Sequence, residues 1–327
     1  MLPERRSVPP HPSGSDGGLP RGWRLPVTET LPVTEPLFGR LCLIGAGLIG
    51  GSIARRNLGA RGLAREVVVT AHSAATRDRV RELGFADRVE DDLAAAVEGA
   101  DAVILCVPVG AYAGVMARIA PHLKPGAILT DVGSTKGSVI RDLSPLLPPG
   151  VHLVPAHPMA GTEYSGPDAG FPTLFEGRYV IITPPEGTDA LAVEQVRELW
   201  RRCGSMIETM DAGTHDKVVA IVSHLPHLIA FTICGTADDL SEETRESVLK
   251  FAASGFRDFT RIAGSDVAMW RDVFLNNREA VLEMLARFTE DAQAFGRAIR
   301  WGEAGFIEDR IERGRKIRAG LIERKQA

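Results

Sequence analysis

His157 stands between prolines and small residues, in the run Val154-Pro155-Ala156-His157-Pro158, where a strand is expected to end. A histidine in this position could accept or donate a proton near neutral pH, which makes it a candidate general acid or base. Without further support, a histidine in such a setting is more often structural. The run therefore predicts catalysis, with a structural histidine as the alternative.

Two further histidines, His224 and His227, lie three residues apart and would share one face of a helix. Pro226 between them distorts the turn and leaves a backbone carbonyl without its N–H partner. Contact of His227 with a ligand is one interpretation of this pair. The alternatives are a core histidine bonded to the backbone and a metal site, for which no third ligand is visible.

Arg261 shares the stretch 255–263 with Arg257 and Asp258. Its guanidinium could bind a substrate carboxylate through two parallel hydrogen bonds. The alternative is a surface ion pair with Asp258, three residues earlier, which would add little stability. Spacing alone favours the surface pair.

A glycine-rich turn is the sharpest local signal for a cofactor. Residues Gly45, Gly47 and Gly50 fit the pattern G-x-G-x-x-G after a strand and before a helix. Gly45 permits the tight turn, Gly47 lets the backbone approach a pyrophosphate, and Gly50 lets helix and strand pack closely. The pyrophosphate would lie on the helix N-terminus, at Leu48 and Ile49. The turn predicts dinucleotide binding, and a purely structural turn is the alternative.

The rest of the cofactor crevice is expected where later strands end. Val107 and Pro108 follow one strand, and Asp131 and Ser134 follow the next, beside the nicotinamide.

The choice of cofactor depends on the end of the second strand, where an acid would bind the ribose hydroxyls of NAD. No acid is present there, and the donors His72, Ser73 and Arg77 suit a 2′-phosphate instead. We expect NADP to be preferred, with NAD as the alternative.

The apolar pattern predicts elements that position these residues. Short apolar runs alternate with helical segments from residue 38 to 188, the rhythm of a parallel sheet. The expected strands are Arg40–Ile44, Val67–Ala71, Ala102–Val107, Ala127–Asp131, Val151–Pro155 and Tyr179–Thr183. Helical periodicity then dominates over 189–327. The fold class is therefore α/β, a Rossmann-type dinucleotide-binding domain followed by an all-helical dimerisation and substrate domain. Residues 1–37, rich in proline and glycine, are expected to be disordered.

The helix over 216–234 is apolar on nearly every side and must be buried. In so small a domain a second subunit is the expected cover, which predicts a homodimer.

Composition excludes other partners. The net charge of −4 gives no electrostatic case for nucleic acid or an anionic membrane. No apolar stretch approaches the ~18 residues of a transmembrane helix. The four cysteines lie far apart in apolar runs, which indicates reduced thiols and a cytoplasmic protein.

Taken together, the motifs resemble those of the prephenate/arogenate dehydrogenases of tyrosine biosynthesis, especially the broad-specificity cyclohexadienyl type. They follow the family's order from about Leu41 to the last helix. The matching motifs are Gly45–Ser52, Asp131–Lys136, His157–Gly161, Ser223–His227, and Gly255–Ala263 followed by Ser265, Asp266, Met269 and Trp270.

The resemblance implies oxidation of the C4 carbinol of prephenate or arogenate, with hydride leaving for the nicotinamide and carboxylate lost from C1. It implies that His157, near the ordinary histidine pKa of ~6.5, takes the hydroxyl proton and that Ser134 bonds the same hydroxyl. Arg261 would bind the substrate carboxylate. The other implied substrate-binding residues are His224, His227, Thr162, Glu163, Asp258 and Trp270.

Two other function classes stay open. A β-hydroxyacid dehydrogenase or imine reductase would need a catalytic Lys, Asp or Tyr deep in the helical domain, and Lys217 and Lys250 have no supporting motif. A non-catalytic dinucleotide sensor would be expected to lack the residues described above. Tyrosine resembles the substrate and could inhibit competitively.

Overall fold

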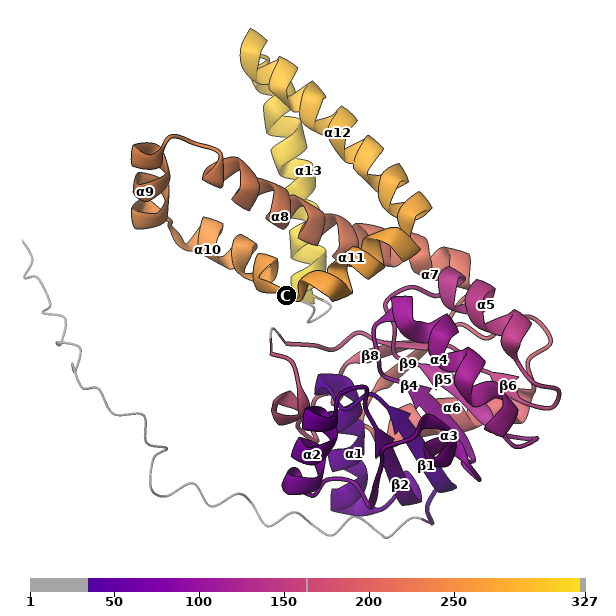
Figure 1. Cartoon of the computed structure of the whole chain (residues 1–327). Helices are drawn as coiled ribbons and strands as arrows, with labels where there is room; N and C mark the ends of the chain where they lie inside the picture. Colours follow the sequence, from indigo (N-terminus) through magenta and orange to yellow (C-terminus); the bar gives the residue numbers. More distant parts are fainter. Residues whose placement is uncertain (1–34, 163, 324–327) are drawn as a thin grey trace, which may run out of the picture. The chain divides into compact units, whose positions relative to one another are not determined.

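The computed structural model describes residues 35–162 and 164–323, an α/β part followed by helices (Figure 1). Most of the expected disordered tail and Glu163 lie outside the described residues.

Six parallel strands form the main sheet, in the order β3-β2-β1-β4-β5-β6. The neighbours β1 and β4 are the point where the strand order reverses, and ligands of such sheets bind at the carboxyl ends there. The predicted α/β class is confirmed, although the short β3 was not expected. The strands are β1 (Phe38–Ile44), β2 (Ala64–Thr70), β3 (Arg88–Glu90), β4 (Ala102–Leu105), β5 (Ile128–Asp131) and β6 (His152–Leu153).

Alternation along the strands supplies two cores, one on each face of the sheet. In β1, Leu41 and Leu43 face the core that contains α1 and α2, whereas Cys42 and Ile44 face the core that contains α3, α4 and α5. A sheet covered on both faces needs apolar residues at successive positions, which explains its continuous apolar runs. The helices are α1 (Leu48–Ala60), α2 (Ala74–Leu83), α3 (Leu93–Val97), α4 (Tyr112–Ile119) and α5 (Gly137–Leu143).

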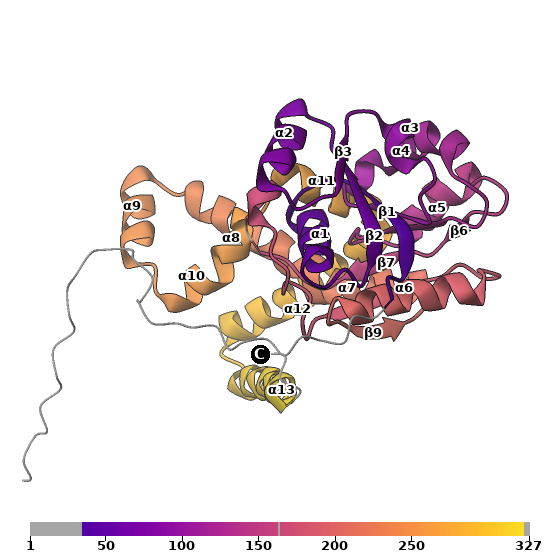
Figure 2. The same cartoon turned by 90° about the horizontal axis from the view of Figure 1, so that it is seen from below.

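A second sheet, in the order β7-β8-β9, extends the α/β part. It contains β7 (Ala156–Pro158), β8 (Tyr179–Ile182) and β9 (Met206–Thr209), and helix α6 (Ala190–Arg202) packs beside β9 (Figure 2). Trp200 of α6 is fully buried in the same core as β1. The expected boundary at 188/189 falls before α6 and β9, and on this packing we propose that the dinucleotide-binding domain extends to Met210.

The helical part begins with α7 (Ala212–Val219) and α8 (Leu225–Asp238), joined through a π-helical segment, Ala220–His224. By length and composition, this continuous helix could cross a membrane. The expectation that no apolar stretch approaches that length is therefore wrong on this criterion. Its polar side chains His215 and His224 are nevertheless buried inside the protein.

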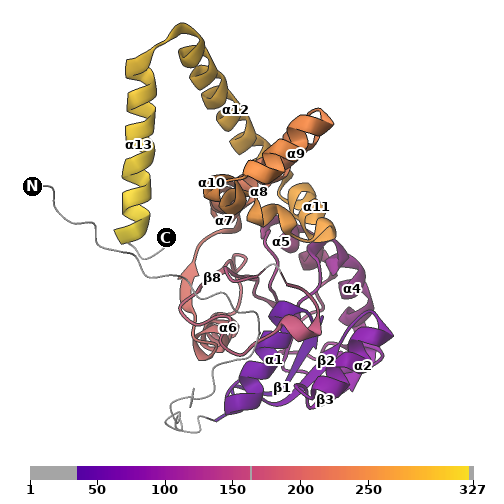
Figure 3. The same ribbon diagram turned by 90° about the vertical axis from the view of Figure 1, so that its left-hand side faces the viewer.

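The remaining helices follow along the chain. They are α9 (Glu242–Phe251), α10 (Ser254–Thr260), α11 (Val267–Asn276), α12 (Arg278–Trp301) and α13 (Ala304–Glu323). Helix α13 packs on α12 and runs back along it in the opposite direction (Figure 3). No residue of α13 is buried in the single chain.

The glycine-rich turn between β1 and α1 is closely packed at two of its glycines. Gly45 has φ +112°, and a Cβ on Gly50 would lie 2.1 Å from the Gly45 carbonyl oxygen. A Cβ on Gly47 would meet nothing within 4 Å.

We expect Gly50→Ala to lower the free energy of unfolding by about 3 kcal/mol, because the added methyl meets backbone rather than a movable side chain. Gly47→Ala is the matched control and should leave stability within about 0.5 kcal/mol of wild type, as at unstrained sites. Urea unfolding measures both. Equal losses in the two variants would contradict the packing role of Gly50.

Candidate active site

The carboxyl ends of β1 and β4 meet beside the N-terminus of α1. This terminus has no side-chain cap and no acidic residue in its first turn, and Leu48 and Ile49 begin the helix. Its unpaired N–H groups and the helix dipole suit an anionic pyrophosphate. The backbone N–H of Gly45 donates to the Thr70 carbonyl at 2.8 Å, which ties the turn to β2. The residues present therefore fit a dinucleotide.

Val107 and Pro108 follow β4 at the same edge of the sheet, where Val107 is partly exposed and Pro108 is exposed. Asp131 at the end of β5 was expected to contact the cofactor, but its carboxylate is fully buried and is used inside the protein. It pairs with Lys136 Nζ at 2.5 Å and accepts from the backbone N–H of Gly133 at 2.8 Å.

Arg77, in the first turns of α2, lies at the end of β2. Its guanidinium donates to the carbonyls of Ala71 and His72 at 2.6 and 3.0 Å, and to Asp91 at 2.7 Å. Ser73 caps α2 by accepting from the Thr76 N–H at 3.0 Å. The predicted donors are thus brought together, but Asp91 already neutralises Arg77.

His157 is buried in β7 and is held by a chain of hydrogen bonds. Its Nδ1 lies 2.8 Å from Nε2 of His215, and Nδ1 of His215 lies 2.8 Å from Oδ1 of Asp216. Asp216 also accepts from the backbone N–H groups of Lys136 and Gly137, both at 2.8 Å. The Asp216 carboxylate therefore connects the start of α5 to the His215 ring, which in turn contacts His157.

The backbone before His157 is held separately. Lys136 Nζ donates to the Ala156 carbonyl at 2.7 Å, and Asp131 Oδ1 accepts from the Ala156 N–H at 3.2 Å. Ser134 lies in the turn between Asp131 and Lys136, is partly exposed, and forms no hydrogen bond with its hydroxyl within the described residues. Its hydroxyl is available to a ligand beside β7.

The environment of His157 disfavours its charged form. Burial lowers the pKa of His157 well below the ordinary histidine value, and the neighbouring His215, Lys136 and His224 lower it further. The expectation of a pKa near ~6.5 is therefore corrected: desolvation keeps the ring neutral to lower pH.

His224, His227 and Trp270 form an aromatic cluster, as predicted from their motifs. The His227 ring stacks on Trp270 with centroids 3.7 Å apart, and the His224 ring meets Trp270 edge-on at 5.9 Å. His227 Nδ1 donates to the Ser223 carbonyl at 2.9 Å. The distortion expected at Pro226 is confirmed by the π-helical turn before it.

His224 is fully buried, and Asn277 Nδ2 donates to its Nδ1 at 3.1 Å. Its Nε2 therefore carries the proton, and this buried donor has no partner among the described residues. A buried polar group of this kind is satisfied when a ligand supplies an acceptor.

Arg261, Asp258 and Thr162 are exposed and are not part of the buried cluster. Arg261 forms no ion pair with Asp258, so the surface-pair alternative is not what the structure has. Burial above all lowers the pKa of His227. The hydrogen bond to Ser223 acts to raise that pKa, and the nearby positive charge of Arg261 lowers it further.

Within 35–162 and 164–323, no cluster of His, Cys, Asp and Glu side chains could hold a metal ion.

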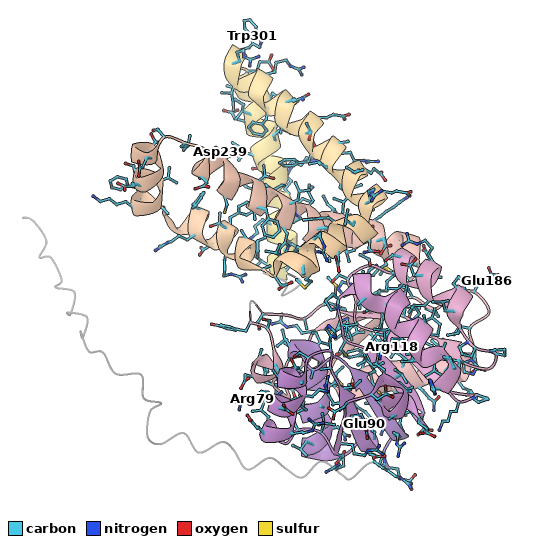
Figure 4. The ribbon with its side chains drawn as sticks, viewed as in Figure 1. Arg79, Glu90, Arg118, Glu186, Asp239 and Trp301 are labelled. Carbon is cyan, nitrogen blue, oxygen red and sulfur yellow. The ribbon has the colours of Figure 1, made fainter. Side chains whose placement is uncertain are left out.

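The loop after His157 returns over α1 and α2. Phe171 N–H donates to Ser52 Oγ at 3.0 Å, and Arg79, labelled on α2 in Figure 4, binds Asp168 at 2.6 Å. These bonds hold the loop beside the glycine-rich turn.

No local motif predicted His215, Asp216, Asn277 or the role of Lys136. One signal was available: His215 and Asp216 are adjacent polar residues at the start of an otherwise apolar helix. Buried charges require partners, so such a pair indicates contacts made elsewhere in the chain.

Buried histidines should make the protein sensitive to acid. Burial above all lowers the pKa of His224 from 6.5 to about 4. Between pH ~6.5 and about 4, the unfolded chain binds a proton on His224 that the folded protein does not bind. The free energy of unfolding therefore falls as the pH drops. For His224 alone the loss at pH 5 is about 2 kcal/mol.

Urea unfolding at pH 7.5 and pH 5, at one protein concentration, measures this loss. His224→Gln should lose about 2 kcal/mol less between the two pH values than wild type. His122→Gln, an exposed histidine, is the control. The same acid sensitivity in wild type and His224→Gln would count against the assignment.

Known proteins match both parts of the chain. A family model described as prephenate dehydrogenase, nucleotide-binding domain, matches residues 54–209, and one described as prephenate dehydrogenase, dimerization domain, matches residues 211–310. The cyclohexadienyl dehydrogenase of Zymomonas mobilis is 39% identical over 287 residues, covering 87% of this chain and 97% of that protein.

Solved structures of proteins with these names are also similar to this chain. The A. aeolicus prephenate dehydrogenase in complex with hydroxyphenyl propionate and NAD+ has a TM-score of 0.78 at 31% identity, covering 87% of this chain and 97% of that one. The Synechocystis arogenate dehydrogenase has a TM-score of 0.73 at 25% identity, covering 86% and 99%.

Proposed function

We infer that this chain, which belongs to the prephenate dehydrogenase family, is a prephenate/cyclohexadienyl dehydrogenase of tyrosine biosynthesis. The observation that carries the inference is the family match across both parts of the chain, 54–209 and 211–310. The reaction oxidises the C4 carbinol of the cyclohexadiene and releases the C1 carboxylate as carbon dioxide.

We propose that His157 Nε2 accepts the C4 hydroxyl proton. The ring is neutral, and its Nδ1 is engaged with His215, which leaves Nε2 for the substrate. Ser134, with a free hydroxyl in the turn beside β7, would bond the same substrate oxygen. A bound nicotinamide supplies the hydride acceptor.

We propose that the helical part binds the substrate anion. Arg261 has no ion-pair partner in the described chain, and a guanidinium suits a carboxylate. His227, held by Ser223 and stacked on Trp270, and the unpaired Nε2 of His224 supply further polar contacts. Thr162, Glu163 and Asp258 remain proposed substrate contacts.

A homodimer is the proposed assembly. In the single chain, Ile221 and Val222 are 49% and 57% exposed on a helix that is otherwise apolar. An apolar pocket of about 310 Å³ lies between α8, α11 and α12, lined in part by Leu228, Phe231, Phe274, Val281, Leu282 and Leu285. Trp301 at the end of α12 is also exposed (Figure 4). Sedimentation should give twice the chain mass of 35.2 kDa, and a monomer would refute the assembly.

His157→Asn should lower kcat by about 10²–10⁴, the usual contribution of a positioned base, with KM little changed. Absorbance at 340 nm with prephenate or arogenate measures the rate. Activity within threefold of wild type would remove His157 from this role, whereas no activity of the wild type on either substrate would refute the function itself.

Arg261→Ala should raise KM for the cyclohexadiene about 10- to 150-fold, because a charge-assisted contact is lost in ground and transition states alike. Arg257→Ala, an exposed arginine on the preceding turn, is the control. A change confined to the cofactor KM would contradict the assignment. Competitive inhibition by tyrosine, measured with the same substrate, should weaken in parallel.

For the cofactor we propose a preference for NADP. No acid follows β2 in the positions of His72 and Ser73, and the Arg77 guanidinium is fixed at the strand end by the Ala71 and His72 carbonyls. Asp91 competes with a 2′-phosphate for this guanidinium.

The ratio of kcat/KM for NADP and NAD tests this. Asp91→Asn should increase the preference for NADP, since it frees Arg77, and His72→Asp with Arg77→Ala should shift the ratio toward NAD. Losing one charge-assisted contact is worth roughly 10- to 150-fold. A wild-type enzyme that favours NAD tenfold or more would refute the preference.

A further inference from the structure

The side chains behind His157 form a buried series that the proposed reaction does not yet use. His157, His215 and Asp216 are all buried, and consecutive members are joined at 2.8 Å. The series starts in β7 and ends in α7, so it crosses between the two parts of the chain. Asp216 is the only member that binds the α5 backbone as well.

Donor and acceptor roles along this series follow from its carboxylate end. Asp216, when ionised, only accepts, so Nδ1 of His215 must carry a proton and donate it. Nε2 of His215 is then an acceptor, and Nδ1 of His157 must donate to it. The proton on Nδ1 of His157 leaves a lone pair on Nε2, on the opposite side of the ring.

The carboxylate end stays ionised. Burial acts to raise the pKa of Asp216, but the hydrogen bonds from His215, Lys136 and Gly137 outweigh it and lower that pKa overall. The charged or titratable groups that act on His157 are His215 from α7, Lys136 from the β5–α5 turn and His224 from the π-helical segment. All three disfavour a positive charge on the His157 ring itself.

We propose that Asp216 and His215 are positioning residues that fix the proton of His157 on Nδ1 and receive the positive charge generated when His157 takes the substrate proton. The proposal rests on the dehydrogenase function inferred above and deepens it.

The C4 O–H bond would break and its proton would bind Nε2 of His157, while C4 would lose a hydride, with two electrons, to the acceptor that a bound nicotinamide would supply. The Nδ1 proton of His157 passes to Nε2 of His215. His157 is then neutral again, and the imidazolium on His215 lies beside the Asp216 carboxylate, so the three groups change from a net charge of −1 to 0.

Two substitutions at His215 separate its functions. His215→Phe retains a ring that packs against His157 but removes both hydrogen bonds. His215→Gln can offer a carbonyl oxygen to the His157 N–H, yet it cannot hold the transferred proton. We expect kcat to fall about 100-fold in His215→Phe and about tenfold in His215→Gln, with substrate KM within threefold. The exposed His122→Gln is the control and should retain full activity.

Imidazole ¹⁵N spectra of the full-length protein give a readout that needs no substrate. The His157 signals, assigned by their loss in His157→Asn, should show a protonated Nδ1 in wild type and in His215→Gln, but a protonated Nε2 in His215→Phe. A protonated Nε2 in the wild type, or His215→Phe activity within threefold of wild type, would overturn the proposal. If the wild type lacked dehydrogenase activity, the spectra would still decide the tautomer, so the two failures are distinguishable.

Discussion

The carboxylate of Asp216 is the interaction on which the arrangement of the site depends. It caps the start of α5 through two backbone N–H groups and bonds the ring of His215. The α/β part and the helical part therefore share one buried charge, and removing one partner of such a group typically costs about 3–5 kcal/mol. The geometry behind His157 is thus set by the contact that docks the helical part.

A second buried charge fixes the other side of the same residue. The Asp131–Lys136 pair is fully buried, and each member bonds Ala156. Burying two charges is expensive unless their remaining hydrogen-bonding capacity is used, and here backbone groups of β7 use it. His157 is therefore held through its ring by α7 and through its backbone by the β5–α5 turn, and neither contact depends on the surface loops.

The parts of the site that could be predicted from the sequence are those whose residues lie close together in the chain. A few neighbouring residues were enough to indicate the glycine-rich turn, the His224–His227 segment and His157. The strands and helices expected around them are present. The His215–Asp216 contacts were missed because they join positions 58 to 80 residues apart. The short strand β9 has little buried apolar surface, so its pattern was too weak to predict it. The lowered pKa of His157 depends on burial by several elements, which no local motif reports.

The long sequence separation of these contacts has a consequence for folding. Loop-closure entropy opposes contacts between distant positions until other interactions hold the ends together, and chains of this length tend to fold one domain at a time. The parallel sheet can form from residues before Met210, but in that intermediate the ring of His157 has no partner at Nδ1. A chain folded only as far as Met210 would present the glycine-rich turn but would lack His215, the partner that the proposed role of His157 requires.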